Sequence, residues 1–320
     1  MNRSKTKNVS AWIGIDVSKA QLDIASSHPD IKLPSQLPND KHGHQELIKI
    51  IAKNHHIKII FEATGGYEKA LLISLQERKI HATRANPAQV RAYAKAQGLL
   101  AKTDRIDACL LAKYGETFQP EATWLISPEL DEIRDLLRCR RYLREQLHRE
   151  KMQLEHTRSK DVTSLLKKRL KAIEKELLEI TKTIIAKSRE LESLRPAIEK
   201  LVSVKGVAEL TAISLLVAMP ELGKITRKQA AALAGVAPMN CDSGKIRGHR
   251  RIQGGRGEIR QAMYMATIVA CRYEPTLKEF YQRLLANGKA KKVAITAVMR
   301  KLILHLNSLM RNHLQSLETH

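Results

Sequence analysis

The middle of the chain carries a long apolar seam that constrains the fold more than any other feature. From residue 166 it advances in alternating steps of four and three, through Leu166, Leu170, Ile173, Leu177, Ile180, Ile184, Lys187, Leu191 and Leu194. A looser version precedes it, through Leu130, Ile133, Leu137, Arg140, Arg144, Leu147, Lys151 and Leu154. This spacing predicts two long helices packed as a coiled coil, broken near residues 159–162. It leaves open whether the seam joins two helices of one chain or two subunits.

The first third of the chain has a different pattern, typical of an α/β domain. Short apolar runs predict strands, and the segments between them have the caps and breakers of helices. Ser18, Lys19 and Ala20 are expected to connect the first two strands as a hairpin. Strands are expected at 12–15, 22–25, 57–61 and 80–84, and helices at about 45–53, from 67, from Asn86-Pro87 to Gly98, and from Thr103 to Gly115.

After Pro196 the chain is expected to be helical again. The segment Val204-Lys205-Gly206-Val207-Ala208 is close to a helix-hairpin-helix turn, in which small residues let backbone amides approach a DNA phosphate. A plain glycine turn between two helices explains the same residues. Further helices are expected at 230–236, 258–272, 277–286 and 290–311, with a loop at 237–257. We therefore expect three domains, at 11–125, 126–195 and 196–320.

Four acidic residues in the α/β region form a candidate metal site. Asp16 lies in the first expected strand, and Glu62 lies at the end of a later one. Asp104 and Asp107 lie at the start of an expected helix, three residues apart, so they share one face of that helix. Carboxylates are ligands that Mg²⁺ or Mn²⁺ prefers, and two divalent cations favour phosphoryl transfer on DNA. Taken singly, each acid has a structural explanation, such as a turn or a favourable interaction with a helix N-terminus.

The charge of the chain indicates a polyanionic partner. Lys and Arg number 56 against 33 Asp and Glu, a formal charge of +23, and the excess is uneven along the chain. Such an excess attracts nucleic acid, although it also serves solubility. Aromatic residues make up 4%, which favours phosphate contacts over base stacking. The four cysteines have no CxxC spacing, so a reduced cytoplasmic chain is expected. No apolar stretch is judged long enough to cross a membrane, and no membrane partner is expected.

A basic, glycine-containing loop follows Ala237-Pro238. Glycine lets a backbone approach a ligand closely, and guanidinium groups can bind phosphates with two hydrogen bonds. His249 is also a candidate general base, although a phosphate contact is the favoured role for this loop histidine. Together with Lys205 and Gly206, the candidate nucleic-acid-binding residues are Lys245, Arg247, His249, Arg250, Arg251, Arg256 and Arg260.

The order of the acids resembles an RNase H/RuvC-like nuclease core. More narrowly, three segments are similar to the DEDD transposases of the insertion sequence 110 family, which are related to the Piv-type invertases. They are Gly14-Ile15-Asp16-Val17-Ser18-Lys19, Glu62-Ala63-Thr64-Gly65-Gly66-Tyr67-Glu68 and Ala101-Lys102-Thr103-Asp104-Arg105-Ile106-Asp107-Ala108. The resemblance covers almost the whole chain. It implies an α/β RuvC-like domain, a coiled-coil segment and a mainly α-helical C-terminal transposase domain.

The resemblance also implies a mechanism and partners. The serine after Ala237-Pro238 maps onto Ser243, which would attack the scissile phosphate and form a covalent phosphoserine link. Asp16, Glu62, Asp104 and Asp107 would hold Mg²⁺ or Mn²⁺. The implied partners are donor and target DNA and a noncoding bridge RNA, with dimers assembling into a tetramer. A bacterial, cytoplasmic, nucleoid-associated protein is expected.

Three other functions remain open at this point. A RuvC-like nuclease or Holliday junction resolvase would use metal-bound water, with Ser243 only contacting phosphate. An actin-like sugar kinase also opens with Gly14-Ile15-Asp16, but it needs a second glycine-rich phosphate loop that is not evident here. A non-catalytic DNA-binding protein would need none of the four acids.

Overall fold

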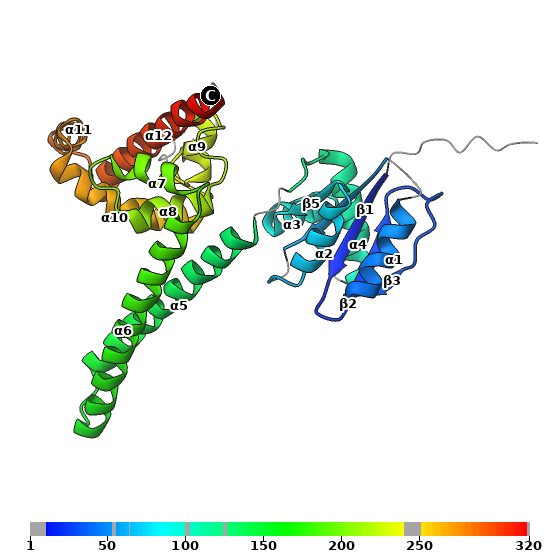
Figure 1. Ribbon diagram of the computed structural model, residues 1–320, viewed down its shortest axis with the longest axis horizontal. Coiled ribbons are helices and arrows are strands. Elements are labelled where there is room, and N and C mark those ends of the chain that lie inside the picture. Colours follow the sequence, from blue (N-terminus) through cyan, green and yellow to red (C-terminus); the bar gives the residue numbers. More distant parts are fainter. Residues whose placement is uncertain are drawn as a thin grey trace, which may run out of the picture. The chain divides into compact units, whose positions relative to one another are not determined.

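The chain folds into two compact units, residues 1–126 (unit 1) and 127–320 (unit 2). The computed structural model describes residues 11–52, 56–63, 65–99, 103–123, 127–239 and 251–318. Unit 1 is α/β and unit 2 is mainly helical, as the sequence predicts (Figure 1). The long seam helices belong to the same compact unit as the C-terminal helices.

Unit 1 is built on a mixed five-stranded sheet in the order β3-β2-β1-β4-β5. The hairpin of β1 and β2 is antiparallel and continues into β3, whereas β4 and β5 run parallel to β1. This order and these directions are consistent with an RNase H-like fold. The strands are β1 (Ala11–Val17), β2 (Gln21–Ser26), β3 (Gln36–Pro38), β4 (Ile57–Glu62) and β5 (Ala82–Ala85). The short β3, which carries one buried leucine, was not predicted.

Helices cover both faces of this sheet. Apolar residues of α1 (Lys41–Ile51) and α2 (Lys69–Glu77) share a core with Ile13 and Ile15 of β1. On the other face, α3 (Pro87–Ala96) and α4 (Asp104–Phe118) pack with Trp12 and Ile60. The predicted cap of α3 is confirmed, because the Asn86 side chain accepts a hydrogen bond from the Ala88 amide and Pro87 is the first helical residue.

Two glycines let α4 lie directly on β1. A Cβ atom at Gly14 would come within 2.1 Å of the Ala108 carbonyl oxygen and 2.4 Å of the Ala112 nitrogen. A Cβ atom at Gly115 would lie 2.6 Å from the Trp12 ring. The predicted end of this helix at Gly115 is therefore wrong. Gly115 serves close packing rather than termination, and α4 ends at Phe118, followed by the capping residue Gln119, whose φ is 44°.

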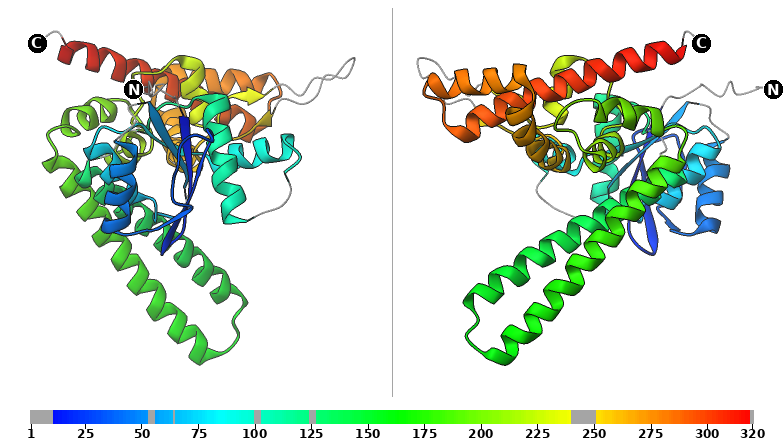
Figure 2. Two further views of the ribbon diagram at one scale, coloured as in Figure 1. Left: turned by 90° about the vertical axis from the view of Figure 1, so that its right-hand side faces the viewer. Right: turned by 60° about the vertical axis from the view of Figure 1, so that its left-hand side comes forward.

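In unit 2, α5 (Pro128–His156) and α6 (Lys160–Glu190) form an antiparallel hairpin that projects from the other helices (Figures 1 and 2). The break between them lies at residues 157–159, close to the predicted one. Within this chain the seam joins two helices of the same subunit: Leu166, Leu170 and Ile184 are buried along it. The polar seam residue Lys187 pairs with Glu132 at 2.9 Å.

The remaining helices share one large core with the base of that hairpin. The apolar residues of α12 pack into this core, including Val298, Leu302 and Leu306. By length and composition alone α12 would be long enough to cross a membrane, contrary to the sequence-based expectation, and 44% of its most apolar window is buried within the protein. The helices are α7 (Arg195–Val202), α8 (Glu209–Ala218), α9 (Arg227–Leu233), α10 (Gly257–Tyr273), α11 (Pro275–Ala286) and α12 (Lys291–Glu318).

Candidate functional site

Strand alternation places Asp16 and Glu62 on the same face of the unit 1 sheet. Alternate residues of β1 point to opposite faces, so Asp16 shares the face of Trp12 and Gly14, on which α4 lies. On β4 the same alternation puts Glu62 on the face of Ile60. The two strands are parallel neighbours in the sheet, with Ile15 opposite Phe61, so both acids lie one position further along.

Helix α4 adds two more carboxylates to this face. Thr103 caps the helix by accepting a hydrogen bond from the Ile106 amide at 3.3 Å, as predicted. Asp104 and Asp107 occupy the first turn. Because Gly14 lets the next turns of α4 touch β1, the first turn is held beside the end of the strand that carries Asp16.

The electrostatics show that these acids belong to one cluster. The pKa of Asp16 is raised to about 6, first by burial and then by the carboxylates of Asp107, Asp104, Asp23 and Glu62, in that order. The sequence pattern singled out three of these four neighbours. We call the five residues Asp16, Asp23, Glu62, Asp104 and Asp107 the acidic face.

Asp23 is the member of the acidic face that the sequence reasoning missed. It lies directly opposite Asp16 in the antiparallel pair of β1 and β2, and it is buried. Gln36 Nε2 of β3 donates a hydrogen bond of 2.7 Å to Asp23 Oδ1. The signal was present in the sequence, because Asp23 stands between Leu22 and Ile24 in an apolar strand, and all three residues are buried.

The acidic face fits a divalent cation by charge and by donor type. Its carboxylates are hard oxygen donors, and a cation would relieve the repulsion that raises the pKa of Asp16. Among the residues that the structure describes, no three His, Cys, Asp or Glu side chains already form a closed cluster around a single point. These residues would supply the ligands, and their carboxylates would have to close around an ion on binding.

The turn after β4 explains why Glu68 is not part of the acidic face. Gly65 and Gly66 have φ values of 73° and 110°, which strongly favour glycine. Glu68 Oε2 accepts a hydrogen bond of 2.9 Å from the Gly66 amide, and Oε1 lies 3.6 Å from Arg84 Nη1 of β5. The buried Glu68 carboxylate thus holds the turn that follows Glu62.

Five of the predicted residues, including the proposed nucleophile, lie outside the described part of the chain. They are Ser243, Lys245, Arg247, His249 and Arg250. The ends of this loop are described, in a region that was expected to be only a loop: β6 (Pro238–Met239) pairs antiparallel with β7 (Arg251–Ile252).

The base of this hairpin is held by the two arginines predicted to bind nucleic acid. Arg256 forms two hydrogen bonds with Glu221, at 2.7 and 2.8 Å, and a third with the Ala218 carbonyl. Arg260 Nη1 donates to the carbonyls of Gly235 and Gly254, one on each side of the hairpin. Both guanidinium groups are therefore engaged within the protein in this structure.

Three further residues predicted to bind nucleic acid lie in different surroundings within unit 2. Arg251 is exposed on β7. Gly206 has a φ of 98°, and a Cβ atom there would lie 2.8 Å from the Ala266 carbonyl oxygen of α10. The glycine thus lets the turn between α7 and α8 pack on α10, while the neighbouring Lys205 is exposed.

Comparisons with known proteins agree with this architecture. A transposase model, that of the DEDD transposases of IS110, matches residues 13–157. A second model, described as transposase IS116/IS110/IS902 family, matches residues 198–282. The first match contains the whole acidic face, and the second contains both ends of the β6–β7 hairpin.

Relatives of the chain extend over nearly its full length. The pilin gene-inverting proteins of Moraxella bovis and Moraxella lacunata are each 29% identical over 301 residues, covering 91% of this chain and 93% of theirs. A protein of insertion element IS110 from Streptomyces coelicolor is 29% identical over 129 residues, 40% of this chain and 32% of its own length. The chain therefore belongs to the IS110 family of transposases, with the DEDD group of acids and a Piv-like full-length organisation.

Proposed function

We propose that the protein cuts and rejoins the DNA of an insertion element through a phosphoserine intermediate formed by Ser243. Ser243 Oγ would bond to the scissile phosphorus while the bond from phosphorus to the leaving oxygen breaks. The serine proton would be transferred away, and the leaving oxygen would end as a hydroxyl. The new ester keeps the energy of the phosphodiester bond, so the reverse attack can reseal a strand without ATP.

The observation that carries this proposal is the convergence of carboxylates from three separate segments on one face of an RNase H-like sheet. In that setting Asp16 has a pKa of about 6, which is far from its ordinary value. Perturbed carboxylates at the edge of a sheet are typical of functional sites rather than of stabilising ones. We propose that unit 1 is a RuvC-like catalytic domain on this basis.

Asp16, Glu62, Asp104 and Asp107 would hold Mg²⁺ or Mn²⁺. A bound divalent cation supplies charge stabilisation for the phosphate and lowers the pKa of a coordinated oxygen. Asp23, fixed by Gln36, would orient the Asp16 carboxylate through the β1–β2 pair. The basic loop around Ser243 would bring the hydroxyl and several guanidinium groups to the same phosphate.

The partners in this proposal follow from the family. DNA is the substrate that membership of a transposase family implies. We propose in addition that a noncoding bridge RNA selects donor and target DNA, and that dimers assemble into a tetramer so that several strands are exchanged together. The formal charge of +23 supports contact with more than one nucleic acid. The reaction would take place in the bacterial cytoplasm, at the nucleoid.

The proposal is tested by trapping the covalent link. Wild-type protein is incubated with Mg²⁺, with DNA that contains an end of the element and carries a label on the strand to be cut, and with the RNA that copurifies with the protein. The mixture is then denatured. We expect a labelled protein band that is lost in Ser243→Ala and in Asp104→Asn, but retained in a serine variant elsewhere, such as Ser308→Ala of α12.

The rival reaction is hydrolysis by metal-bound water. One observation favours it: every residue of the acidic face lies in unit 1. Unit 1 would therefore be sufficient for a nuclease that uses metal-bound water. Metal-dependent cleavage that is unchanged in Ser243→Ala, with no covalent adduct in the wild type, would establish hydrolysis and exclude the serine mechanism.

A further inference from the structure

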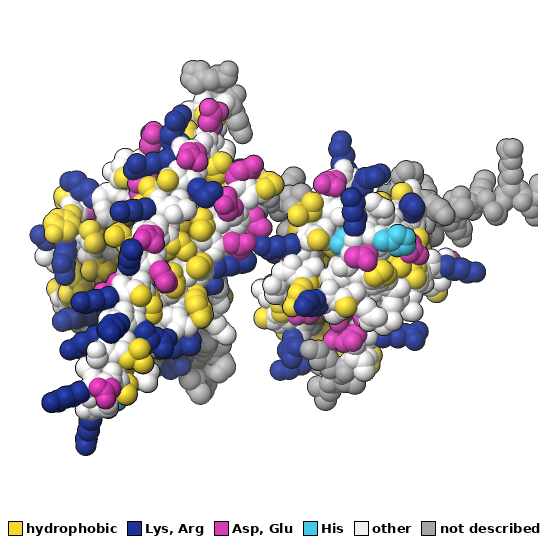
Figure 3. Space-filling view, turned by 60° about the horizontal axis from the view of Figure 1, so that its bottom comes forward, with side chains coloured by type: hydrophobic (Ala, Val, Ile, Leu, Met, Phe, Trp, Pro, Cys, Tyr) yellow, Lys and Arg dark blue, Asp and Glu magenta, His cyan; other side chains and the backbone are white. Residues whose placement is uncertain are grey.

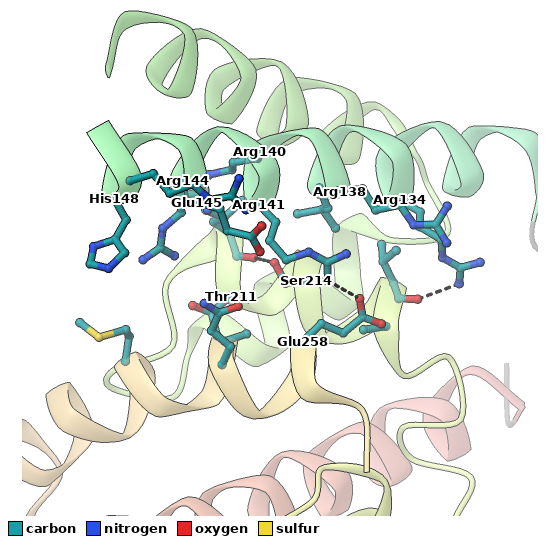
Figure 4. A pocket seen from close by; sticks show the side chains of 18 residues that line it. Arg134, Arg138, Arg140, Arg141, Arg144, Glu145, His148, Thr211, Ser214 and Glu258 are labelled. Atoms are coloured by element: carbon teal, nitrogen blue, oxygen red, sulfur yellow. Dashed lines mark hydrogen bonds and ion pairs between the residues drawn. The ribbon is translucent and has the colours of Figure 1, made fainter. Parts of the chain in front are cut away.

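A groove in unit 2 that is lined by none of the residues predicted to bind nucleic acid has a strongly basic wall. It has a volume of about 870 Å³ and lies between α5 on one side and α8 and α10 on the other (Figure 4). We call it the arginine groove. Its charged lining residues are Arg134, Arg138, Arg140, Arg141, Arg144, Arg149, Glu145 and Glu258, with His148 beside them.

The basic wall arises from the helical period of α5. Arg134, Arg138 and Arg141 are spaced by four and three residues, and Glu145 and His148 continue the same spacing, so they share one face. Figure 4 shows these side chains extending from α5 toward α8 and α10. At about 1.5 Å per residue, the distance from Arg134 to Arg149 is about 22 Å, the length of about six base pairs of DNA.

Internal partners neutralise only part of this wall. Arg138 pairs with Asp135 at 3.1 Å, and Arg141 Nη1 reaches Glu258 Oε2 only at 3.5 Å. Among the described residues, neither Arg144 nor Arg149 has an ion-pair or hydrogen-bond partner, and both are exposed.

Arg140 shows the effect of this crowding. Its Nε donates a 2.8 Å hydrogen bond to Thr181 Oγ1, a neutral acceptor on α6. Burial, and then the neighbouring Arg144 cation, lower the pKa of Arg140. An anion in the groove would relieve this repulsion.

The opposite side of the same helix is arranged differently. Two charged residues of α5 that face α6 have partners of opposite sign: Glu150 pairs with Arg169 at 2.6 Å, and Lys151 with Glu174 at 3.3 Å. In the described part of the chain, the α5 arginines without such a partner include Arg144 and Arg149, which line the groove. On the face seen in Figure 3, Lys and Arg side chains are numerous over the helical unit.

The groove leads to the start of α10, where the β6–β7 hairpin ends. A second hollow of about 690 Å³ shares Arg138, Arg141 and Glu258 with the groove and continues to Arg256 and Gly257. Only four residues separate the end of β7 from Gly257. The floor offers a hydroxyl group from Thr211 and an amide group from Gln261, both suited to phosphate oxygens.

We propose that the arginine groove binds the phosphate backbone of the DNA duplex that the protein cuts. This proposal rests on the proposed function for its choice of DNA, whereas the groove itself rests on geometry and charge. Arg144 and Arg149 contact phosphates directly, and Glu258 weakens binding through its negative charge. The contacts are independent of base sequence.

The test compares full-length variants by fluorescence anisotropy with a short labelled DNA duplex, and separately with a single-stranded RNA of equal length, in EDTA. Arg144→Ala/Arg149→Ala is expected to weaken duplex binding by about tenfold or more near ~100 mM salt. The slope of log affinity against log salt should fall by about two. Lys167→Ala/Lys171→Ala, on exposed α6 positions outside the groove, removes the same charge and should leave the slope unchanged.

A variant of opposite sign sharpens the test. Glu258→Gln should tighten duplex binding by about two- to fivefold, because it releases Arg141 and removes a negative charge from the lining. Equal losses in the groove and control variants would overturn the proposal, as would losses limited to RNA. The serine adduct is measured on the same proteins. If the wild type forms no adduct but the groove variants still bind DNA more weakly, only the Ser243 mechanism is refuted. If the adduct forms but the groove variants bind DNA as tightly as the wild type, only the groove proposal is refuted.

Discussion

The acidic face of unit 1 and the arginine groove of unit 2 have opposite charge but share one property. Each crowds like charges that the protein itself does not fully neutralise. Burial and four carboxylates raise the pKa of Asp16 to about 6, and burial with Arg144 lowers the pKa of Arg140. By contrast, Arg256 and Glu221 neutralise each other at the base of the β6–β7 hairpin. Unneutralised crowding costs stability, so it marks the places where a ligand of opposite charge gains most.

The two sites differ in how the chain builds them. The arginine wall comes from one helix, whose period alone aligns its side chains. The acidic face needs β1, β2, β4 and α4, and it depends on Gly14 to seat the helix. The acidic face should therefore be lost through distant packing changes, whereas the alignment of the arginines should depend on α5 alone.

The largest expected effect separates chemistry from binding. Asp16→Asn should reduce single-turnover DNA cleavage at saturating DNA by about a thousandfold or more, since it removes a central metal ligand. Its duplex affinity in EDTA should match wild type. Arg144→Ala/Arg149→Ala should show the reverse, with weak affinity and near-normal cleavage once DNA saturates.

An exposed acid of unit 1 provides the control for that pair. Asp30→Asn changes the same charge on a surface residue that only approaches His28, and it should leave both measurements unaltered. Normal cleavage by Asp16→Asn would break the comparison, because the acidic face would then have no catalytic role.

The next effect tests how the acidic face is held. Gly14→Ala should destabilise unit 1 by about 1–3 kcal/mol, because the new methyl group meets the backbone of α4. Denaturant unfolding measures the loss, and stabilisation by added Mg²⁺ should fall with it. Gly257→Ala is the matched control: nothing lies within 4 Å of its Cβ position, so stability should be unchanged or slightly higher. An unperturbed Gly14→Ala protein would show that α4 can shift freely.

A smaller effect concerns Arg256, which already forms an ion pair with Glu221. Arg256→Ala and Glu221→Gln should each destabilise unit 2 by about 1–2 kcal/mol, and the double variant should cost less than their sum. Neither should lower the salt slope of DNA binding as the groove variant does. A lower slope with unchanged stability in Arg256→Ala would instead make Arg256 a DNA contact, as the sequence predicted.

The smallest effect is a gain of stability without metal. In EDTA at pH 7, Asp16→Asn should stabilise the protein by about 1 kcal/mol, a figure reduced for solvent screening of a partly exposed group. The folded pKa lies above the ordinary one, so the wild type should lose stability relative to Asp16→Asn as pH rises from 4 through about 6. Thermal unfolding across this pH range measures it. A constant difference would mean that Asp16 is not crowded in solution.

Local pattern predicted most of the elements in this chain. The caps at Asn86 and Thr103, the β1–β2 hairpin and the two seam helices are confirmed within a few residues, because each depends on neighbouring residues. Errors arose where tertiary contact overrides local preference. Gly115 resembles a helix stop, yet it lies inside α4 because Trp12 occupies the space of a side chain.

The candidate sites show the same division. Spacing was enough to single out Asp16, Glu62, Asp104 and Asp107, but not Asp23, whose place opposite Asp16 depends on strand register. For Arg256 and Arg260 the sequence predicts phosphate contacts, but it does not show which carboxylate or carbonyl groups their guanidinium groups reach in the structure. The roles of Ser243 and its neighbouring basic residues stay predictions.

By itself the sequence determined the order of elements, the family and the identity of the acids, since helical and strand periods are properties of the chain. Only the tertiary structure decided which face each charge shares with which neighbour. The sequence spacing places Arg140 and Arg144 in the seam and gives the other α5 arginines no role. In the structure these arginines line a groove because α8 and α10 face them. The physical reason is that electrostatic energy depends on distance through space and on burial, and neither is encoded at any single position of the sequence.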